Sequence, residues 1–286
     1  MTTAPSTLTV PASLDADVRA ALAEDVGSGD VTATLIPATR NGAATVVCRE
    51  PAVLAGAPWF DRVFQLLDPA VAVTWHFQDG DAVPPAAVVC TLRGSARALV
   101  TGERTALNFL QTLSGTATAT RHHVAALGVT RTRVLDTRKT LPGLRAAQKY
   151  AVRAGGGDNH RMGLFDAILI KENHIAAVGS ITAAVAALRH THPTLRIEVE
   201  VETQAELDEA LAVGVEMILL DNFDVAAMRT AIAQVAGRAL LEISGGVAVS
   251  DLAALGPIGA DYISIGALTK HLQAIDFSMR IVAGAD

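Results

Sequence analysis

The second half of the chain repeats one pattern, in which a short aliphatic run ends in a polar residue or glycine and is followed by residues with helical periodicity. Successive runs start roughly 20 to 35 residues apart, as successive strand–helix units of a parallel sheet do. The pattern predicts an α/β barrel or a doubly wound sheet. The runs are Val134–Thr137, Ala167–Lys171, Arg196–Glu202, Glu216–Asp221, Ala239–Gly246 and Asp261–Gly266.

Residues suited to beginning a helix stand between the runs. Ser180, Asp224 and Ser250 each precede a helical stretch, and their side chains can accept hydrogen bonds from the first free N–H groups of a helix. Thr203 with Glu206 has the spacing of a capping box. We therefore expect one helix after each of these residues.

The run Ile197–Glu202 helps to decide between a barrel and an open sheet, because glutamate and aliphatic residues alternate along it. A period of two puts all the glutamates on one face of the strand and the aliphatic residues on the other. A face with three carboxylates is tolerable only beside cations or a metal in a polar interior, so the run favours a barrel. The glutamates are Glu198, Glu200 and Glu202.

The N-terminal part lacks this repeat. Apolar runs over Thr45–Arg49, Ala52–Gly56, Val71–Phe77 and Val88–Leu92 are joined by turn-rich segments and predict strands, with a helix over 57–67 and a long helix over 101–127.

These patterns predict two domains. The first is an α+β, sandwich-like domain over residues 1–112, on which the tail 271–286 packs back. The second is a parallel α/β catalytic barrel over 113–270 with six to seven strands, which makes it incomplete relative to the usual eight.

Composition narrows the class of protein. The chain has 286 residues, of which 50% are hydrophobic, and a net charge of −6, which argues against a basic nucleic-acid-binding face. Two cysteines are too few for a disulfide framework, and the N-terminus does not match a secretory signal, so we expect a cytoplasmic protein. No apolar stretch is long enough to predict a membrane span.

Within this acidic chain, cations gather between Val134 and Ile175, with Gly155, Gly156 and Gly157 in the same stretch. Such a local cluster predicts an anion-binding site that the backbone can approach closely. Lys149 and Arg153 could instead line a solvated helix face. The basic residues are Arg138, Lys139, Arg145, Lys149, Arg153, Arg161 and Lys171, with His160 beside them.

Several polar residues stand at the carboxyl ends of the predicted strands, the edge that carries the active site in α/β barrels. They are Asp136, Arg138, Lys139, Lys171, Glu200, Asp221, Ser244 and Gly266.

Seven segments in order carry a resemblance to a known family: GERTALNFLQTLSGTATATR, LDTRKTLPGLR, GGGDNHRMGLFDAILIKENHI, EVEVE, ILLDN, SGGV and YISIGALTK. Together they resemble quinolinate phosphoribosyltransferase, and with ALAEDVGSGDVTATL the similarity covers nearly the whole chain. The resemblance implies an enzyme that joins quinolinate to phosphoribosyl pyrophosphate and releases pyrophosphate and CO2. Its product, nicotinate mononucleotide, would serve NAD synthesis.

The resemblance also implies which residues act. Quinolinate is a planar dicarboxylate, which guanidinium forks bind with paired hydrogen bonds. Glu200 and Asp221 would engage the ribose hydroxyls and Mg2+, and with Lys139 and Lys171 they form the expected catalytic set. The residues expected to bind quinolinate are Arg104, Arg138, Lys139, His160, Arg161 and Lys171. Those expected to bind the 5-phosphate are Ser244, Gly245, Gly246, Gly266 and Ala267, and Thr137 and Ile265 complete the expected substrate-binding set.

The resemblance further implies that Arg104 reaches into the pocket of a neighbouring subunit, which makes a homodimer the catalytic unit, while a hexamer stays open. Glu198 or Glu202 could share the role given to Glu200. Three other functions compete: a Schiff-base aldolase that uses Lys171, a phosphosugar-binding module without catalysis, and a phosphoribosyltransferase for nicotinate or another heterocycle.

Overall fold

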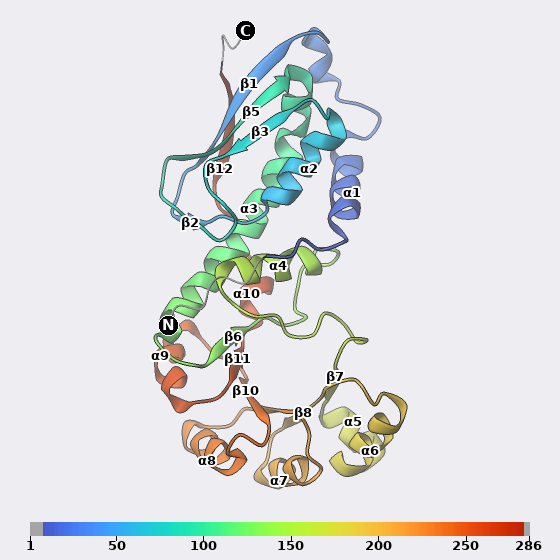
Figure 1. Cartoon of the computed structure of the whole chain (residues 1–286), viewed down its shortest axis with the longest axis vertical. Helices are drawn as coiled ribbons and strands as arrows, with labels where there is room; N and C mark the ends of the chain where they lie inside the picture. Colours follow the sequence, from blue (N-terminus) through green and yellow to red (C-terminus); the bar gives the residue numbers. More distant parts are fainter. Residues whose placement is uncertain (1–7, 283–286) are drawn as a thin grey trace. The chain divides into compact units, whose positions relative to one another are not determined.

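The computed structural model describes residues 8–282, and the chain divides into two compact units (Figure 1). The first contains residues up to Arg121, the segment Thr140–Gly156 and the chain from Ala267 onward; the second contains His122–Lys139 and Gly157–Gly266. This division differs from the expected boundary at residue 112. Helix α3 (Ala96–Leu127) continues through that position, and helix α4 (Arg145–Gly155) belongs to the first unit.

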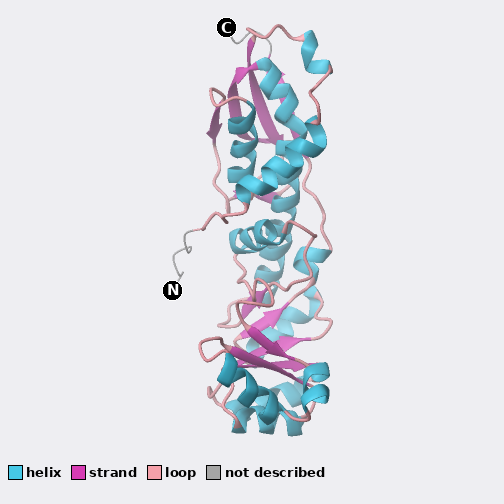
Figure 2. Cartoon of the chain, turned by 90° about the vertical axis from the view of Figure 1, so that its right-hand side faces the viewer, coloured by secondary structure: helices cyan, strands magenta, loops and turns pink. Residues whose placement is uncertain are grey.

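The first unit is built on a four-stranded antiparallel sheet with helices over one face (Figure 2). Its strand order is β12 (Phe277–Val282), β1 (Asn41–Cys48), β5 (Ala87–Ser95) and β3 (Ala72–Trp75), and β2 (Ala52–Val53) pairs with β4 (Ala82–Val83). The helices are α1 (Leu14–Val26), α2 (Ala57–Leu67), α3 and α4, with the turn η1 at Thr32–Leu35 and the short α10 at Ala267–Lys270.

Strand and helix in this unit meet in one apolar core. Trp59, Phe60 and Phe64 of α2 are fully buried with Leu92 of β5 and Leu99 of α3. α2 occupies the expected range 57–67, whereas α3 begins five residues before the expected helix start at 101.

The C-terminal segment contributes the edge strand β12, which pairs antiparallel with β1 through pairs such as Val46 with Met279. Phe277 and Met279 are buried and alternate with polar Ser278 and Arg280. This alternation was not read as a strand from the sequence.

The glycine run 155–157 does not form the expected open cradle along its length. Gly155 lies in α4, where an added Cβ would come within 2.5 Å of the Ala117 carbonyl oxygen of α3. Gly156 ends α4 in the left-handed conformation at φ 95°. These two glycines therefore serve helix packing and helix termination.

The second unit is a six-stranded parallel sheet in the order β6, β11, β10, β9, β8, β7, which confirms the six expected strands. In Figure 1 the helices α5 to α8 lie on the outer side of this curled sheet. The strands are β6 (Arg133–Leu135), β7 (Ile168–Ile170), β8 (Ile197–Val201), β9 (Met217–Asp221), β10 (Leu240–Ser244) and β11 (Tyr262–Ser264). The helices are α5 (Glu172–Val178), α6 (Ile181–Thr191), α7 (Gln204–Ala212), α8 (Val225–Val235) and α9 (Leu252–Leu255), with the turns η2 (Val249–Asp251) and η3 (Gly256–Ile258).

Most of the expected helix starts are confirmed. Ser180 and Asp224 accept N–H bonds at the starts of α6 and α8, and Thr203 with Glu206 forms the capping box of α7. The helix α9 also follows Ser250, but Ser250 does not cap it: its hydroxyl donates to Asp251 Oδ1, and the Asp251 carboxylate accepts the Ala248 N–H at the turn η2.

The curled sheet does not close into a continuous barrel within the described residues, where no ladder joins β6 to β7. Instead, Asp158 forms a parallel bridge with Leu135, and its N–H donates to the Val134 carbonyl at 2.8 Å. The segment at Asp158 thus extends the sheet beside β6 without forming a full strand.

No helix in the part of the chain from residue 8 to residue 282 combines the length and the apolar character that crossing a bilayer requires.

One carboxylate holds the start of α2. Asp79 accepts hydrogen bonds from the Gly56 N–H at 3.0 Å, the Ala57 N–H at 3.3 Å and the Tyr150 hydroxyl at 2.7 Å. Burial raises the pKa of this carboxyl against the effect of these three donors. Asp79 therefore joins a turn, a helix start and α4 at a single partly buried point.

We expect Asp79→Ala to lower the free energy of unfolding by about 2 kcal/mol, because it leaves buried donors without an acceptor. Tyr150→Phe removes only one of the three bonds and should cost about 1 kcal/mol. Urea unfolding of both variants measures the difference, and equal midpoints for Asp79→Ala and the parent protein would contradict this role.

Candidate active site

The carboxyl ends of the parallel strands in the second unit form one edge, and the expected polar residues of that unit lie along it. Thr137, Arg138 and Lys139 follow β6, Lys171 follows β7, and Asp221 ends β9. Glu200 lies near the end of β8, Ser244–Gly246 end and follow β10, and Ile265 and Gly266 follow β11. A parallel sheet thus brings together residues that are more than 100 positions apart.

Lys171 and Glu200 form an ion pair on this edge. Lys171 is also the first residue before α5, where its N–H donates to His174 Nδ1 at 3.0 Å. Burial raises the pKa of Glu200, the bond from Lys171 lowers it, and the nearby Asp221 raises it further. Glu200 therefore lies between a cation from the end of β7 and the carboxylate of Asp221 from the end of β9.

Asp221 is held by the turn that follows β9. Asn222 Nδ2 donates to Asp221 Oδ2 at 2.9 Å, and Asn222 itself has a left-handed φ of 58°. Gly245 of the next turn comes so close that an added Cβ would lie 2.8 Å from Asn222 Oδ1. The two turns thus pack closely, and Asn222 orients the Asp221 carboxylate, a role that was not predicted.

Arg161 and Arg138 place two guanidinium groups near each other. Burial lowers the pKa of Arg161, repulsion by Arg138 lowers it further, and attraction by Glu198 and Asp166 opposes both effects. Arg161 Nη1 also donates to the Ala167 carbonyl at 3.5 Å. Neighbouring like charges in a half-buried position favour an anion as their common partner.

Lys139 lies over Gly266. Its N–H donates to Thr137 Oγ1 at 3.1 Å, and its Cδ would be 2.8 Å from a Cβ added to Gly266. A glycine at position 266 therefore lets the lysine side chain cross from the loop after β6 to the loop after β11.

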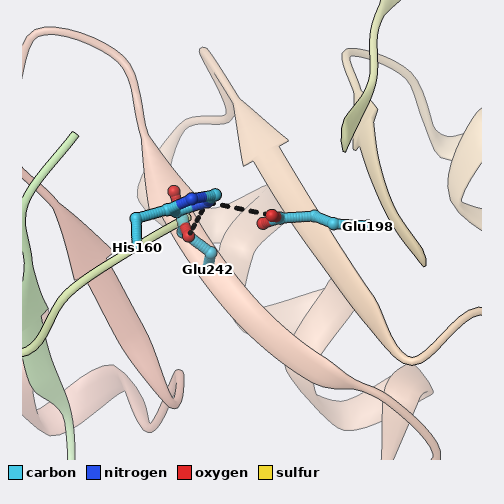
Figure 3. Close-up of side chains that lie close together, drawn as sticks. All are labelled: His160, Glu198 and Glu242. Carbon is cyan, nitrogen blue, oxygen red and sulfur yellow. Dashed lines mark ion pairs between the residues drawn. The ribbon is translucent and has the colours of Figure 1, made fainter. Parts of the chain in front are cut away.

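His160 contacts two carboxylates inside the curled sheet (Figure 3). Its Nε2 lies 2.9 Å from Glu198 Oε2 and 3.4 Å from Glu242 Oε2. Glu242 was not predicted, although it stands two residues before Ser244 on the same strand face, and that spacing could have identified it. The register pairs Leu219 with both Glu200 and Glu242, so these two carboxylates share the inner face.

The three glutamates in and after β8 therefore have different surroundings. Glu198 is 2% exposed and contacts His160, Glu200 pairs with Lys171, and Glu202 is exposed. Asp136, also considered as a ligand or internal partner, is fully buried and accepts the His160 N–H at 2.8 Å.

The remaining expected residues belong to the first unit. Arg104 is exposed on α3, and Ala267 is the first residue of α10. Arg145 begins α4 and donates from Nε to Thr140 Oγ1 at 3.1 Å.

Two family models match the chain. The quinolinate phosphoribosyl transferase N-terminal domain matches residues 30–114, and the C-terminal domain of the same family matches residues 116–280. The chain belongs to the quinolinate phosphoribosyltransferase family.

Curated relatives and solved structures agree with this assignment. The chain is 45% identical over 265 residues to a probable nicotinate-nucleotide pyrophosphorylase [carboxylating] of Synechocystis, an alignment that covers 91% of this chain and 90% of the relative. It is 43% identical to the nicotinate-nucleotide pyrophosphorylase [carboxylating] of Mycobacterium leprae, with 92% and 95% covered. The nicotinate-nucleotide pyrophosphorylase structure from Francisella tularensis has a TM-score of 0.93 at 42% identity and covers 98% of this chain and 100% of that one.

The contact between the turns after β9 and β10 gives a test of this edge. Gly245 and Gly246 both have positive φ, at 101° and 56°, but only Gly245 has neighbours that an added Cβ would meet. We expect Gly245→Ala to cost about 2 kcal/mol of stability and Gly246→Ala about 1 kcal/mol. Thermal unfolding of the two variants makes the comparison, and a loss for Gly246→Ala equal to or greater than that for Gly245→Ala would contradict the packing described.

Proposed function

We propose that the protein transfers the phosphoribosyl group of phosphoribosyl pyrophosphate to quinolinate with decarboxylation. The products are nicotinate mononucleotide, pyrophosphate and CO2, and the reaction serves de novo NAD biosynthesis. Support comes from the family and from the printed names of relatives, which include a quinolinate phosphoribosyltransferase [decarboxylating] of Nicotiana tabacum at 37% identity.

The observation that carries this proposal is that Arg138, just after β6, and Arg161, whose segment is bonded to Asp136 at the end of β6, lie on the sheet edge that also carries Glu200 and Asp221. A dicarboxylate suits two guanidinium forks, each able to form parallel hydrogen bonds. Lys139 and Lys171 add charge on the same edge, and Thr137 adds a hydroxyl. We assign this group to quinolinate.

Glu200 and Asp221 suit a hard divalent cation. They are oxygen donors close enough for the charge of Asp221 to raise the pKa of Glu200, so a cation between them would relieve their repulsion. We assign Mg2+ to this pair, either directly or through phosphoribosyl pyrophosphate. When bound, Mg2+ neutralises charge on the departing pyrophosphate.

The residues of the chain then have separable tasks. As the bond from ribose C1 to pyrophosphate breaks, positive charge grows on the ribose, and the Glu200 carboxylate can stabilise it. Lys139 lies between the two substrates and offers its ammonium to either. The pyridine nitrogen supplies the electron pair of the new bond to C1.

Decarboxylation follows from the charge of the product ring. Once the ring nitrogen is quaternary, the bond to the adjacent carboxylate breaks, CO2 leaves, and the electron pair stays on the ring carbon beside the positive nitrogen. That carbon takes a proton from water or from Lys171.

The 5-phosphate suits the turns Ser244–Gly246 and Ile265–Ala267. Gly245 and Gly246 have positive φ and carry no side chain, so a phosphate can approach the backbone of this turn closely. Arg104, exposed on α3, suits the expected contribution to the site of a second copy, so we assign a homodimer as the catalytic unit. Cys48 and Cys90 are free and buried, which suits a cytoplasmic enzyme.

The ion pair between Lys171 and Glu200 argues against the aldolase reading, because a Schiff base requires an uncharged amine.

Product analysis tests the proposal. Purified protein with Mg2+, phosphoribosyl pyrophosphate and quinolinate should release pyrophosphate and CO2 in equal amounts with nicotinate mononucleotide, whereas nicotinate should give no product. No product from either acceptor would support a binding module, and product from nicotinate alone would support a different phosphoribosyltransferase.

We expect Arg161→Ala to raise the KM for quinolinate by about tenfold or more, because one guanidinium fork is lost. The KM for phosphoribosyl pyrophosphate should change much less. Arg238→Ala removes an exposed arginine just before β10, at the opposite edge of the same sheet, and serves as the charge-matched control. Similar changes in both KM values would overturn the assignment of Arg161.

Asp221→Ala should weaken the cation site and raise the Mg2+ concentration that gives half-maximal rate by about tenfold. The KM for quinolinate should stay close to that of the parent enzyme. Rate measurements across a Mg2+ series test this expectation, and an unchanged Mg2+ dependence would remove Asp221 from the cation site.

A further inference from the structure

His160, Glu198 and Glu242, here called the buried trio, meet inside the curled sheet (Figure 3). Glu198 is 2% exposed and Glu242 is 1% exposed. Among the described residues, Glu198 Oε1 and Glu242 Oε2 are buried oxygens with no hydrogen-bond partner. Burying carboxylate oxygens without partners costs free energy, so their presence here needs a specific structural or functional reason.

The hydrogen bonds of His160 define the state of its ring. The Arg161 N–H donates to His160 Nδ1 at 2.7 Å, so Nδ1 acts as an acceptor and carries no proton. The ring proton therefore resides on Nε2, which faces Glu198 Oε2 at 2.9 Å. His160 is bound at both ring nitrogens by its own chain.

Burial and neighbouring charges act in opposite directions on the pKa values within the buried trio. Burial lowers the pKa of His160, but the neighbouring carboxylates of Glu198 and Glu242 outweigh it and raise the pKa to about 9. Burial raises the pKa of Glu242. The bond into Nδ1 opposes a second ring proton, but Nε2 carries a proton and faces Glu198 in either state of the ring.

The composition of the buried trio, one imidazole and two carboxylates, would also suit a divalent metal. A metal on Nε2 requires the ring proton on Nδ1, where it would donate to a second group. The donor at Nδ1 is the Arg161 N–H itself, so the hydrogen-bond pattern opposes a metal.

We infer that Glu198 is a positioning residue, which locks the His160 ring and through it holds the backbone of Arg161 and the direction of its guanidinium. This inference rests on the proposed function, in which Arg161 binds quinolinate. It gives His160 a supporting role instead of direct contact with the acceptor.

The backbone around Arg161 shows how the buried trio acts. His160 is held from one side by Asp136, which accepts its N–H at 2.8 Å, and from the other by Glu198 at its ring. With the ring fixed, Nδ1 is directed at the Arg161 N–H. Rotation of the ring would break both of its hydrogen bonds and release the peptide that carries Arg161.

Kinetics of Glu198→Ala test the inference. We expect the KM for quinolinate to rise by about tenfold or more, while kcat and the KM for phosphoribosyl pyrophosphate change by less than about threefold. Glu198→Gln keeps an oxygen for the Nε2–H and should recover most of the loss. Glu206→Gln, the same chemical change at a capping residue of α7, should leave all three constants unchanged.

A double-mutant cycle separates positioning from a general loss of structure. Once His160 is replaced by alanine, Glu198→Ala should add little to the KM for quinolinate, since both changes release the same peptide. Additive effects, equal changes in both KM values, or no change in a folded Glu198→Ala variant would each overturn the inference. Absence of product in the parent enzyme would instead overturn the proposed function.

Discussion

Balance of charge inside the curled sheet is the constraint on which the site depends. β8 and β10 present Glu198, Glu200 and Glu242 to the inner face, where unpaired carboxylates are costly. Two residues from the segments flanking β7 contact these carboxylates. His160 contacts Glu198 through Nε2, and Lys171 forms an ion pair with Glu200. The acidic interior and the basic edge are thus parts of one arrangement.

That constraint explains why the outer and inner faces of the strands differ so sharply. Ile197, Val199 and Val201 are buried on the side that α6 and α7 cover, while the alternating glutamates face inward. The helices can then be apolar on their inner side, as the fully buried Ile181 and Leu207 are. Recognition chemistry is left to the strand ends, whose side chains do not have to pack under helices.

Much of this organisation could be predicted from the sequence. The six parallel strands, helix α2 and the caps at Ser180, Thr203 and Asp224 follow from local periodicity and capping chemistry. A helix also follows Ser250, but there the acceptor at the preceding turn is the neighbouring Asp251 carboxylate and not the Ser250 hydroxyl.

The misses share a different cause, because they depend on partners distant in the chain. Strand β12 forms only because β1 offers it an edge, and Gly155 is needed where α3 crosses α4. Glu242 could not be joined to His160 without knowing that β10 and β8 lie two strands apart around a common interior. The strand periodicity predicted on which face of the sheet each glutamate lies, but not which basic residue contacts it.

The most direct test of this account is a crystal structure of the protein with quinolinate bound. The account predicts both carboxylates of quinolinate within hydrogen-bonding distance of the guanidinium groups of Arg138 and Arg161, with the His160 ring still directed at Glu198. Quinolinate bound away from the two arginines, or a His160 ring turned up to contact it, would contradict the account.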